Sequence, residues 1–210
     1  MKRLAFLTIT LPLLSACAGT TDPNYQYYLQ KKGLDTPIPQ HFQHCHGYGC
    51  KHISVVNFTQ NDWQEFEKLF SPPPPNAAAE RKRIARAIAL FEQKVGRITG
   101  TDEDIWGTFQ KTGPYQLDCV DESTNTTIYL SLLEQEGLLR FHRIEAPTAR
   151  VPILHAGRWP HQTALISETD TSRFFVVDSW FHNNGELPEI VPLKDWKAGW
   201  KPEKKENEER

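Results

Sequence analysis

Two apolar segments separated by a short polar one constrain the fold of this chain most strongly. Residues 161–167 and 174–181 are rich in apolar and β-branched side chains, and residues 168–173 between them are polar. This arrangement predicts an antiparallel β-hairpin. Helical patterns precede it: apolar residues recur at helical spacing in 77–95, and a second helix is expected over 119–136. A hairpin that follows amphipathic helices indicates the α+β class.

The other expected elements are shorter, and each is marked by a local signal. Composition marks the strands, side-chain caps mark helix starts, and glycine marks helix ends. We expect a Gly- and His-rich loop over 41–52, strands over 53–58 and 138–144, a short helix capped by Asn61 or Asp62, and a C-cap of the long helix at Gly96.

The first residues have the pattern of an export leader. Lys2 and Arg3 precede an apolar run over 4–14 that is too short to span a bilayer as a mature helix. The stretch Leu-Leu-Ser-Ala-Cys that ends at Cys17 resembles the lipobox of bacterial lipoproteins, in which the cysteine is lipidated and becomes the new N-terminus. The resemblance implies a membrane anchor, and Ala18, in place of Asp, favours the outer membrane, facing the periplasm. The alternative is an ordinary signal peptide cut nearby, with Cys17 incidental.

The leader sets the expected organisation of the chain. Residues 1–16 are the signal peptide, 17–40 a tether with little periodicity, 41–200 a single domain, and 201–210 a charged, disordered tail. The net charge of −2 at pH 7 gives no basic footprint for nucleic acid. The expected partners are a substrate and, through the lipid, the membrane.

The four cysteines have different expected fates. An exported protein meets an oxidising compartment, so Cys45 and Cys50 are expected to pair with each other, while lipid consumes Cys17. Cys119 is then an unpaired thiol. Two other interpretations of the Cys45–Cys50 segment stay open, a plain surface loop and a metal site. The metal ligands would be His44, Cys45, His46, Cys50 and His52.

Cys119 stands at a predicted helix start. Asp118 is a candidate N-cap, and Asp121 occupies the capping-box position three residues later. The free N–H groups and the dipole of a helix start favour a thiolate, and the same N–H groups can stabilise an oxyanion. These features are compatible with a nucleophile at Cys119 but do not by themselves decide for it. The alternative is a buried structural cysteine.

His161 and Asp178 supply the partners that a thiol nucleophile needs. If the hairpin turn is centred between Thr169 and Asp170, His161 lies directly opposite Asp178 on the same face of the sheet. Asp178 lies within an apolar strand, and a buried carboxylate requires a partner. The alternative is a strand-end Asp178 with His161 on the surface; His155 is the one rival base.

These residues resemble the transglutaminase-like cysteine proteinase superfamily, over about residues 105–182. The resemblance lies in Asp118-Cys119 at a helix start, His161 at a strand start and Asp178 on the next strand; papain-like enzymes share this geometry, usually with Asn third. It implies an antiparallel sheet packed against the Cys119 helix, here with additional N-terminal helices. It also implies Cys119 as nucleophile, His161 as general base and then acid, and Asp178 as the group that orients His161.

The expected function is hydrolysis of a peptide or isopeptide bond through a thioester, without a cofactor. The substrate would be a cell-envelope protein or a peptidoglycan peptide. The N–H of Cys119 is the first candidate oxyanion donor, and Gln116 or Trp106 is a candidate second donor. Two alternatives stay open: a non-catalytic binding or scaffolding lipoprotein on the same fold, and a metal-binding protein that uses the His/Cys loop.

Overall fold

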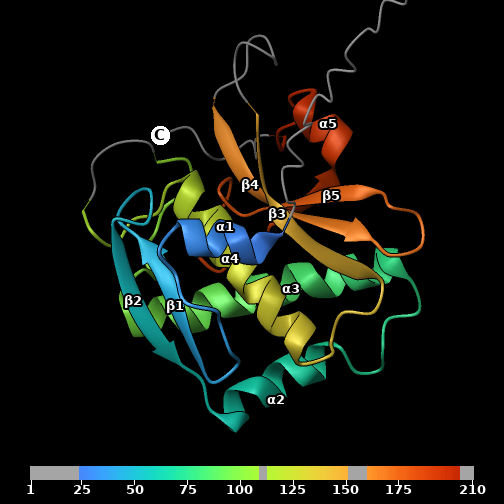
Figure 1. Cartoon of the computed structure of the whole chain (residues 1–210), viewed down its shortest axis with the longest axis horizontal. Helices are drawn as coiled ribbons and strands as arrows, with labels where there is room; N and C mark the ends of the chain where they lie inside the picture. The colour runs from blue at the N-terminus through green and yellow to red at the C-terminus, as the bar shows by residue number, and fades with distance from the viewer. Residues whose placement is uncertain (1–23, 109–112, 151–159, 204–210) are drawn as a thin grey trace, which may run out of the picture.

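The computed structural model describes residues 24–108, 113–150 and 160–203, and it belongs to the α+β class (Figure 1). Four strands form an antiparallel sheet in the order β3-β4-β5-β6, and β1 and β2 form a separate antiparallel pair. The elements in chain order are α1 (Tyr25–Lys31), β1 (His41–His46), β2 (His52–Asn57), α2 (Gln60–Leu69), α3 (Ala77–Thr99), α4 (Cys119–Gln135), β3 (His142–Arg150), β4 (His161–Glu168), β5 (Phe174–Asp178), β6 (Glu189–Pro192) and α5 (Leu193–Lys197).

Helix α4 runs through the middle of the molecule, between the two sheets (Figure 1). Every residue from Asp121 to Leu133 is buried, although many of these side chains are polar. The hydroxyls of Thr124 and Thr127 donate to carbonyl oxygens four residues earlier, at 2.6 and 2.7 Å. Because these hydroxyls find acceptors within their own helix, a polar sequence is stable at the centre of the fold.

An aromatic cluster fills the core around α4. The Phe91 ring of α3 lies 4.2 Å from that of Phe66 in α2 and 4.6 Å from that of Tyr129 in α4, centroid to centroid. Phe42 of β1 packs edge-on against Phe91 and Tyr129. Aromatic burial of this kind joins α2, α3, α4 and β1 into one core.

The hairpin that we predicted is present, but its register differs from the expected one. Ser167 pairs with Phe174 and Ala164 with Val177, so the turn is centred one residue later than we assumed. His161 and Asp178 are therefore diagonal rather than directly opposite. A shift of two positions in the pairing keeps both side chains on the same face, because the side-chain period of a strand is two.

Several boundaries also differ from the sequence-based expectation. The 41–52 loop contains strand β1, and the strand expected over 138–144 begins only at His142. Thr59, rather than Asn61 or Asp62, caps α2. Gly96 lies within α3, and the helix ends at Gly100, whose φ of 82° suits glycine.

Part of the expected tether is structured. Residues 25–31 form α1, and Leu29 and Leu34 are buried in the same core as α4. Tyr28 of α1 hydrogen-bonds Thr124 of α4 at 2.8 Å. Residues 24–40 are thus part of the folded domain.

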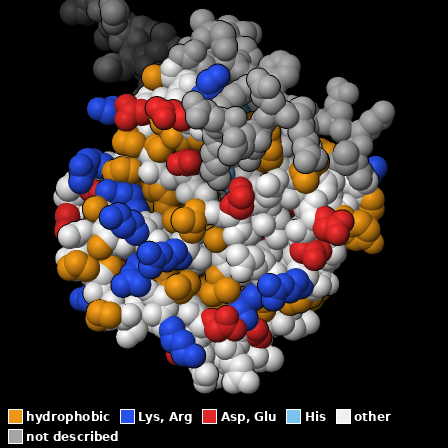
Figure 2. Space-filling view, turned by 180° about the vertical axis from the view of Figure 1, so that it is seen from behind, with side chains coloured by type: hydrophobic (Ala, Val, Ile, Leu, Met, Phe, Trp, Pro, Cys, Tyr) orange, Lys and Arg blue, Asp and Glu red, His pale blue; other side chains and the backbone are white. Residues whose placement is uncertain are grey.

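The outer face of α3 is basic. Lys82, Arg86 and Arg97 are exposed along it, and Figure 2 shows Lys and Arg side chains gathered on the face seen from behind. Arg81 instead turns to the four-stranded sheet, where it pairs with Glu168 at 2.5 Å. Such exposed charges are typical of the solvated side of an amphipathic helix.

The leader, the lipidation site Cys17 and the rival base His155 lie outside the described residues, as does most of the predicted charged tail. Among the helices that the structure describes, none combines the length and the apolar composition needed to cross a membrane. The anchor therefore stays a prediction.

Candidate active site

The first turn of α4 presents Cys119 with one free backbone donor. Asp118 caps the helix: its Oδ1 accepts from the N–H groups of Val120 and Asp121, both at 2.9 Å. In return, the N–H of Asp118 donates to Oδ2 of Asp121 at 3.2 Å, which completes the predicted capping box. The N–H of Glu122 donates to the Asp118 carbonyl at 2.9 Å. Within the described parts of the chain, the N–H of Cys119 is the first-turn donor that remains without an acceptor.

His161 and Asp178 form a buried pair. Nε2 of His161 lies 2.8 Å from Oδ2 and 3.1 Å from Oδ1 of Asp178, and the two residues are only 3 % and 2 % exposed. Burial lowers the pKa of His161, but the charge and hydrogen bond of Asp178 outweigh it, and the neighbouring Cys119 side chain adds to the rise, to about 9. Nδ1 of His161 is buried without a partner at normal hydrogen-bond distance among the described residues.

Hydrogen bonds fix the helix that carries Cys119 against the strands that carry His161 and Asp178. The Gln162 amide donates to Ser123 of α4 at 2.7 Å, and the Ser179 hydroxyl donates to Glu122 of α4 at 2.8 Å. Gln162 follows His161, and Ser179 follows Asp178. These bonds hold the three candidate residues in one place, although no signal in the sequence indicated them.

Trp196 of α5 is a contact of Asp178 that sequence reasoning missed. Its indole N–H donates to Asp178 Oδ2 at 2.8 Å, and its ring is fully buried. Arg150 holds Trp196 in turn, because its guanidinium lies 4.7 Å from the ring centroid and donates to the Trp196 carbonyl at 3.0 Å. A tryptophan in a five-residue helix after Pro192 carries no local signal for this role.

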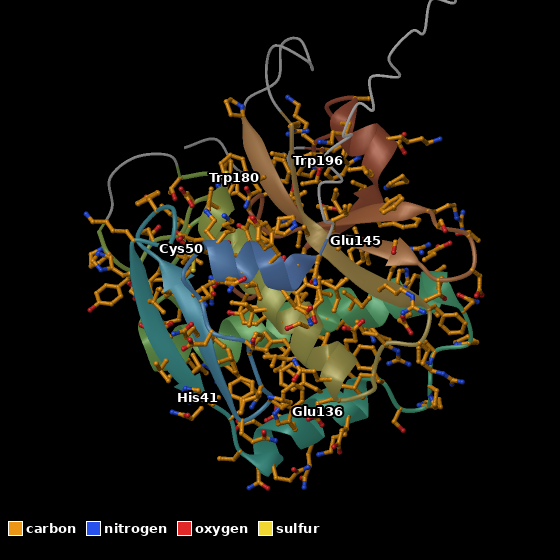
Figure 3. All side chains as sticks on the ribbon, viewed as in Figure 1. His41, Cys50, Glu136, Glu145, Trp180 and Trp196 are labelled. Atoms are coloured by element: carbon orange, nitrogen blue, oxygen red, sulfur yellow. A yellow bond between two sulfur atoms is a disulfide. The ribbon has the colours of Figure 1, made fainter. Side chains whose placement is uncertain are left out.

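Aromatic rings enclose His161. The centroids of Trp180, Phe181 and Trp196 lie 4.7, 5.4 and 5.6 Å from that of the imidazole. Figure 3 shows Trp180 and Trp196 in the same half of the molecule, with Trp196 beside α5. Rings at these distances exclude water from the His161–Asp178 pair and so strengthen its electrostatic interaction.

Three buried acids, Glu122 in the first turn of α4 and the nearby Glu92 and Asp104, interact with one another. Burial raises the pKa of Glu92 to about 8 and that of Asp104 to about 7, and it raises the pKa of Glu122 well above the ordinary value. Gly185 N–H donates to Glu92 at 2.9 Å, and Leu117 N–H to Asp104 at 2.7 Å. Burial therefore favours the protonated, uncharged form of these acids.

Gln116, the candidate second oxyanion donor, is engaged elsewhere. Its side-chain amide donates to the Glu103 carbonyl at 2.9 Å and accepts from the Ile105 N–H at 3.2 Å. The amide thus holds the loop that precedes Trp106. The structure favours the N–H of Cys119 over Gln116 as the donor to an oxyanion.

Cys45 and Cys50 form the predicted disulfide. Two of the ligands that a metal site in this segment would need are engaged in hydrogen bonds. The His44 ring bonds Tyr129 at 2.9 Å, and the His46 ring bonds Ser54 at 2.9 Å. In the described parts of the chain, the one group of three close ligand atoms comprises the two bonded sulfurs and Asp121. Sulfurs in a disulfide lack the thiolate charge that binds metal.

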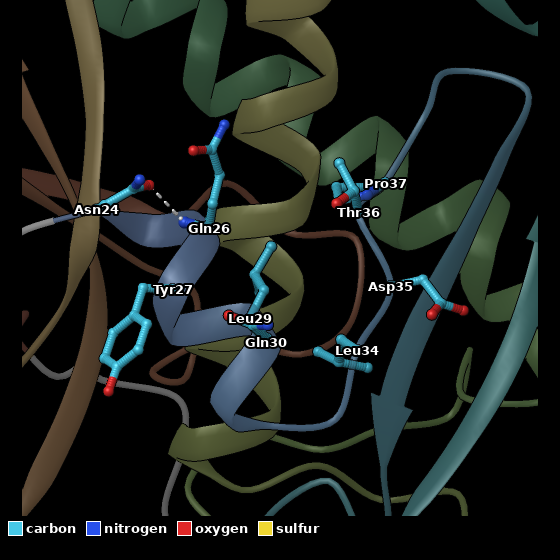
Figure 4. Close-up of a pocket in the computed structure, with 9 residues that line it drawn as sticks. All are labelled: Asn24, Gln26, Tyr27, Leu29, Gln30, Leu34, Asp35, Thr36 and Pro37. Carbon is cyan, nitrogen blue, oxygen red and sulfur yellow. Dashed lines mark hydrogen bonds between the residues drawn. The ribbon is translucent and has the colours of Figure 1, made fainter.

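A cavity of about 600 Å³ lies beside α1, apart from the candidate residues (Figure 4). The amide of Gln43 bonds the carboxylate of Asp35, the acid in its wall, at 3.1 Å. The lining comprises Asn24, Gln26, Tyr27, Leu29, Gln30, Leu34, Asp35, Thr36 and Pro37. None of Cys119, His161 and Asp178 is among these residues.

Comparisons with models of protein families, with curated proteins and with solved structures found no match to this chain. Similarity therefore assigns neither a family nor a function. The functional argument rests on the arrangement of Cys119, His161 and Asp178.

Proposed function

We propose that the chain is a cysteine hydrolase with a transglutaminase-like core, in which Cys119, His161 and Asp178 form the catalytic triad. One observation carries the proposal: His161 is buried with Nε2 held by Asp178, its Nδ1 has no partner at normal hydrogen-bond distance among the described residues, and the Cys119 side chain is near enough to raise the pKa of the ring. A base fixed at one nitrogen and open at the other is what a thiol nucleophile requires.

The proposed reaction forms and then hydrolyses a thioester. His161 takes the Cys119 proton, and the thiolate sulfur attacks the carbonyl carbon of an amide bond. The oxyanion receives a hydrogen bond from the N–H of Cys119. His161 then protonates the leaving amine as the C–N bond breaks. Water, deprotonated by His161, attacks the thioester, releasing the acid and restoring the thiol.

The electrostatics support the first step. With a pKa raised to about 9, His161 keeps the proton that it takes from Cys119 at neutral pH, and the resulting imidazolium stabilises the thiolate beside it. The first-turn N–H and the helix dipole act in the same direction. Asp178 accepts from Nε2 at 2.8 Å and keeps the ring in one orientation.

The substrate that we propose is a peptide or isopeptide bond in a cell-envelope protein or in peptidoglycan. This part of the proposal rests on the leader, which predicts export and lipidation at Cys17. The anchored protein would then face the periplasm from the outer membrane. The family resemblance of the site supplies the reaction type.

The test compares Cys119→Ala with the unchanged chain. We expect peptide-resolved mass spectrometry to show rapid iodoacetamide labelling of Cys119, and the variant to lose amidase activity on envelope peptides while its thermal transition is kept. The partly exposed Cys119 side chain makes little packing contribution, so folding is a valid control. Amidase activity retained by Cys119→Ala, or an inert Cys119 in the unchanged chain, would overturn the proposal; the second result favours a binding protein on this fold.

A further inference from the structure

The loop closed by the Cys45–Cys50 disulfide lies directly on the cap of α4. The N–H groups of Tyr48 and Cys50 donate to the two carboxylate oxygens of Asp121, at 2.7 and 2.5 Å. The N–H of Gly49 donates to Oδ1 of Asp118 at 3.1 Å. Both carboxylates that cap the Cys119 helix are therefore held by one short loop, whose end at Cys50 is marked in Figure 3.

The backbone of this loop is shaped for that contact. Gly47, Tyr48, Gly49 and Cys50 all have positive φ values, of 79°, 72°, 71° and 62°. Two of them are not glycine, and each such residue costs on the order of 1 kcal/mol or more. Successive N–H groups in unusual backbone conformations form a concave anion-binding nest. The disulfide closes this loop and offsets the conformational cost.

Further contacts join the loop to both sides of Cys119. The Gly47 N–H donates to the Gln116 carbonyl at 2.9 Å, in the segment that leads to Cys119. On α4, the Asn125 amide accepts from the N–H of Cys45 at 2.7 Å and donates to its carbonyl at 2.8 Å. A Cβ at Gly47 would come within 2.5 Å of the His52 ring, and the φ of this residue is positive, so the position suits glycine.

The charges explain why this contact matters for a thiolate. Asp118 and Asp121 place two carboxylates within two residues of Cys119. Without compensating groups, these two negative charges would destabilise a thiolate at Cys119. The three loop N–H groups point at those carboxylates, offset their charge and hold them as caps, which leaves the helix start positive towards Cys119.

We propose that the Cys45–Cys50 loop positions the nucleophile through Asp121 and Asp118, so that Cys119 is fully reactive only while the disulfide is closed. The inference rests on the proposed role of Cys119. The chemistry is reversible: a dithiol reductant is oxidised to its disulfide, and Cys45 and Cys50 each gain a hydrogen atom. Asp121 is thus a positioning residue, and the site is under redox control.

The first experiment opens the disulfide in the full chain. Cys119 alkylation by iodoacetamide is timed by peptide-resolved mass spectrometry in the oxidised protein and in the Cys45→Ala/Cys50→Ala variant, with circular dichroism as the folding control. We expect the variant to react about tenfold more slowly, as loss of a helix-terminus environment predicts. An equal rate in a folded variant would overturn the inference while leaving the proposed function intact.

The second experiment keeps the disulfide and moves the carboxylate. Asp121→Glu retains the charge but displaces it from the loop N–H groups, and we expect Cys119 alkylation to slow about tenfold. The matched control is Asp62→Glu, because Asp62 holds the same capping-box position in α2. It should leave the rate unchanged. Equal rates in both variants would overturn the inference, and slow alkylation in the oxidised unchanged chain would overturn it together with the proposed function.

Discussion

The described residues include two buried histidine–carboxylate pairs, at opposite ends of the β3–β4 ladder. His161 lies at the start of β4, opposite Arg150, and His142 lies at the start of β3, opposite Glu168. Nδ1 of His142 is 2.8 Å from Glu80, the same distance that separates His161 from Asp178. Burial and pair distance therefore do not distinguish the two histidines.

The hydrogen bonds at the second ring nitrogen do distinguish them. Nε2 of His142 accepts from the Arg81 guanidinium at 3.3 Å, and Glu80 also accepts from the N–H groups of Arg140 and Phe141. That network is satisfied and locks α3 to β3. Nδ1 of His161 has no such partner in the described chain. The His142 pair, whose hydrogen-bonding groups all have partners, is suited to a structural role. The His161 pair leaves one ring nitrogen available beside a thiol and is suited to proton transfer.

Replacing each histidine separates these roles most sharply. We expect His161→Ala to lower amide hydrolysis by about 10²- to 10⁴-fold, the range of general acid–base catalysis. His142→Ala should leave the turnover rate within about threefold at a temperature where the variant is folded, because its pair contacts no reacting group. Turnover by the two variants is measured side by side. Equal losses of turnover would contradict the distinction.

Removing the carboxylate of Glu80, the partner of His142, should lower the stability of the fold. Glu80→Ala leaves a buried imidazole and two backbone N–H groups without an acceptor, so we expect the free energy of unfolding in urea to fall by about 3–5 kcal/mol. The control is Glu65→Ala. Glu65 is half-exposed in its pair with Lys94, and its loss should cost less than about 1 kcal/mol. If the two variants lost a similar free energy of unfolding, the Glu80 network would not be a stabilising contact between α3 and β3.

The raised pKa of His161 predicts a pH dependence of stability. The folded state holds this proton up to a pKa of about 9, whereas an unfolded histidine releases it near 6.5. The stabilisation is fully present below pH 6.5 and is lost as the pH rises through 9, a change of about 3 kcal/mol at most. Urea unfolding at pH 6 and pH 9.5 measures it. The raised pKa values of Glu92 and Asp104 act in the same direction over this range. In Asp178→Asn the part of the dependence due to His161 should disappear and the part due to those acids should remain, whereas an unchanged slope would contradict the assignment.

The smallest effect concerns Trp196. Trp196→Phe keeps a ring but loses the N–H that donates to Asp178, and we expect turnover to fall about tenfold, which corresponds to one hydrogen bond to a charged group. Trp63→Phe is the matched control, because the Trp63 indole also donates within the core, to the Pro39 carbonyl at 2.9 Å. It should leave turnover unchanged. A similar loss of turnover in both variants would mean that Trp196 is only a packing residue.

Local signals explain what could be predicted from the sequence. The Asp118–Asp121 capping box marked the start of α4, and the helix ends one residue before the expected Glu136. The hairpin was marked by its polar turn. Its register was not, because Ser172 adopts a φ of 52° and lengthens the turn, and nothing in the sequence signals a left-handed serine.

Strand β1 was missed because two of its four buried residues are histidines. His44 and His46 point into the protein, where each ring finds hydrogen-bond partners, so the strand lacks the apolar alternation that marks most strands. Trp196, Arg150 and the Glu92 cluster were missed for a different reason. Their roles depend on contacts between elements distant in the chain, and a single sequence carries no record of such contacts.

The central position of α4 also limits how far this protein can be divided. In the part of the chain that the structure describes, the two sheets share no strand pairing, and α4 contacts both. The family resemblance spans about residues 105–182, but a fragment cut to that span would lack α1, the β1–β2 pair, α3 and Trp196. The Asn125 bonds to Cys45 and the Tyr28 bond to Thr124 would disappear with them. The smallest autonomous version of this site is therefore close to the whole folded domain.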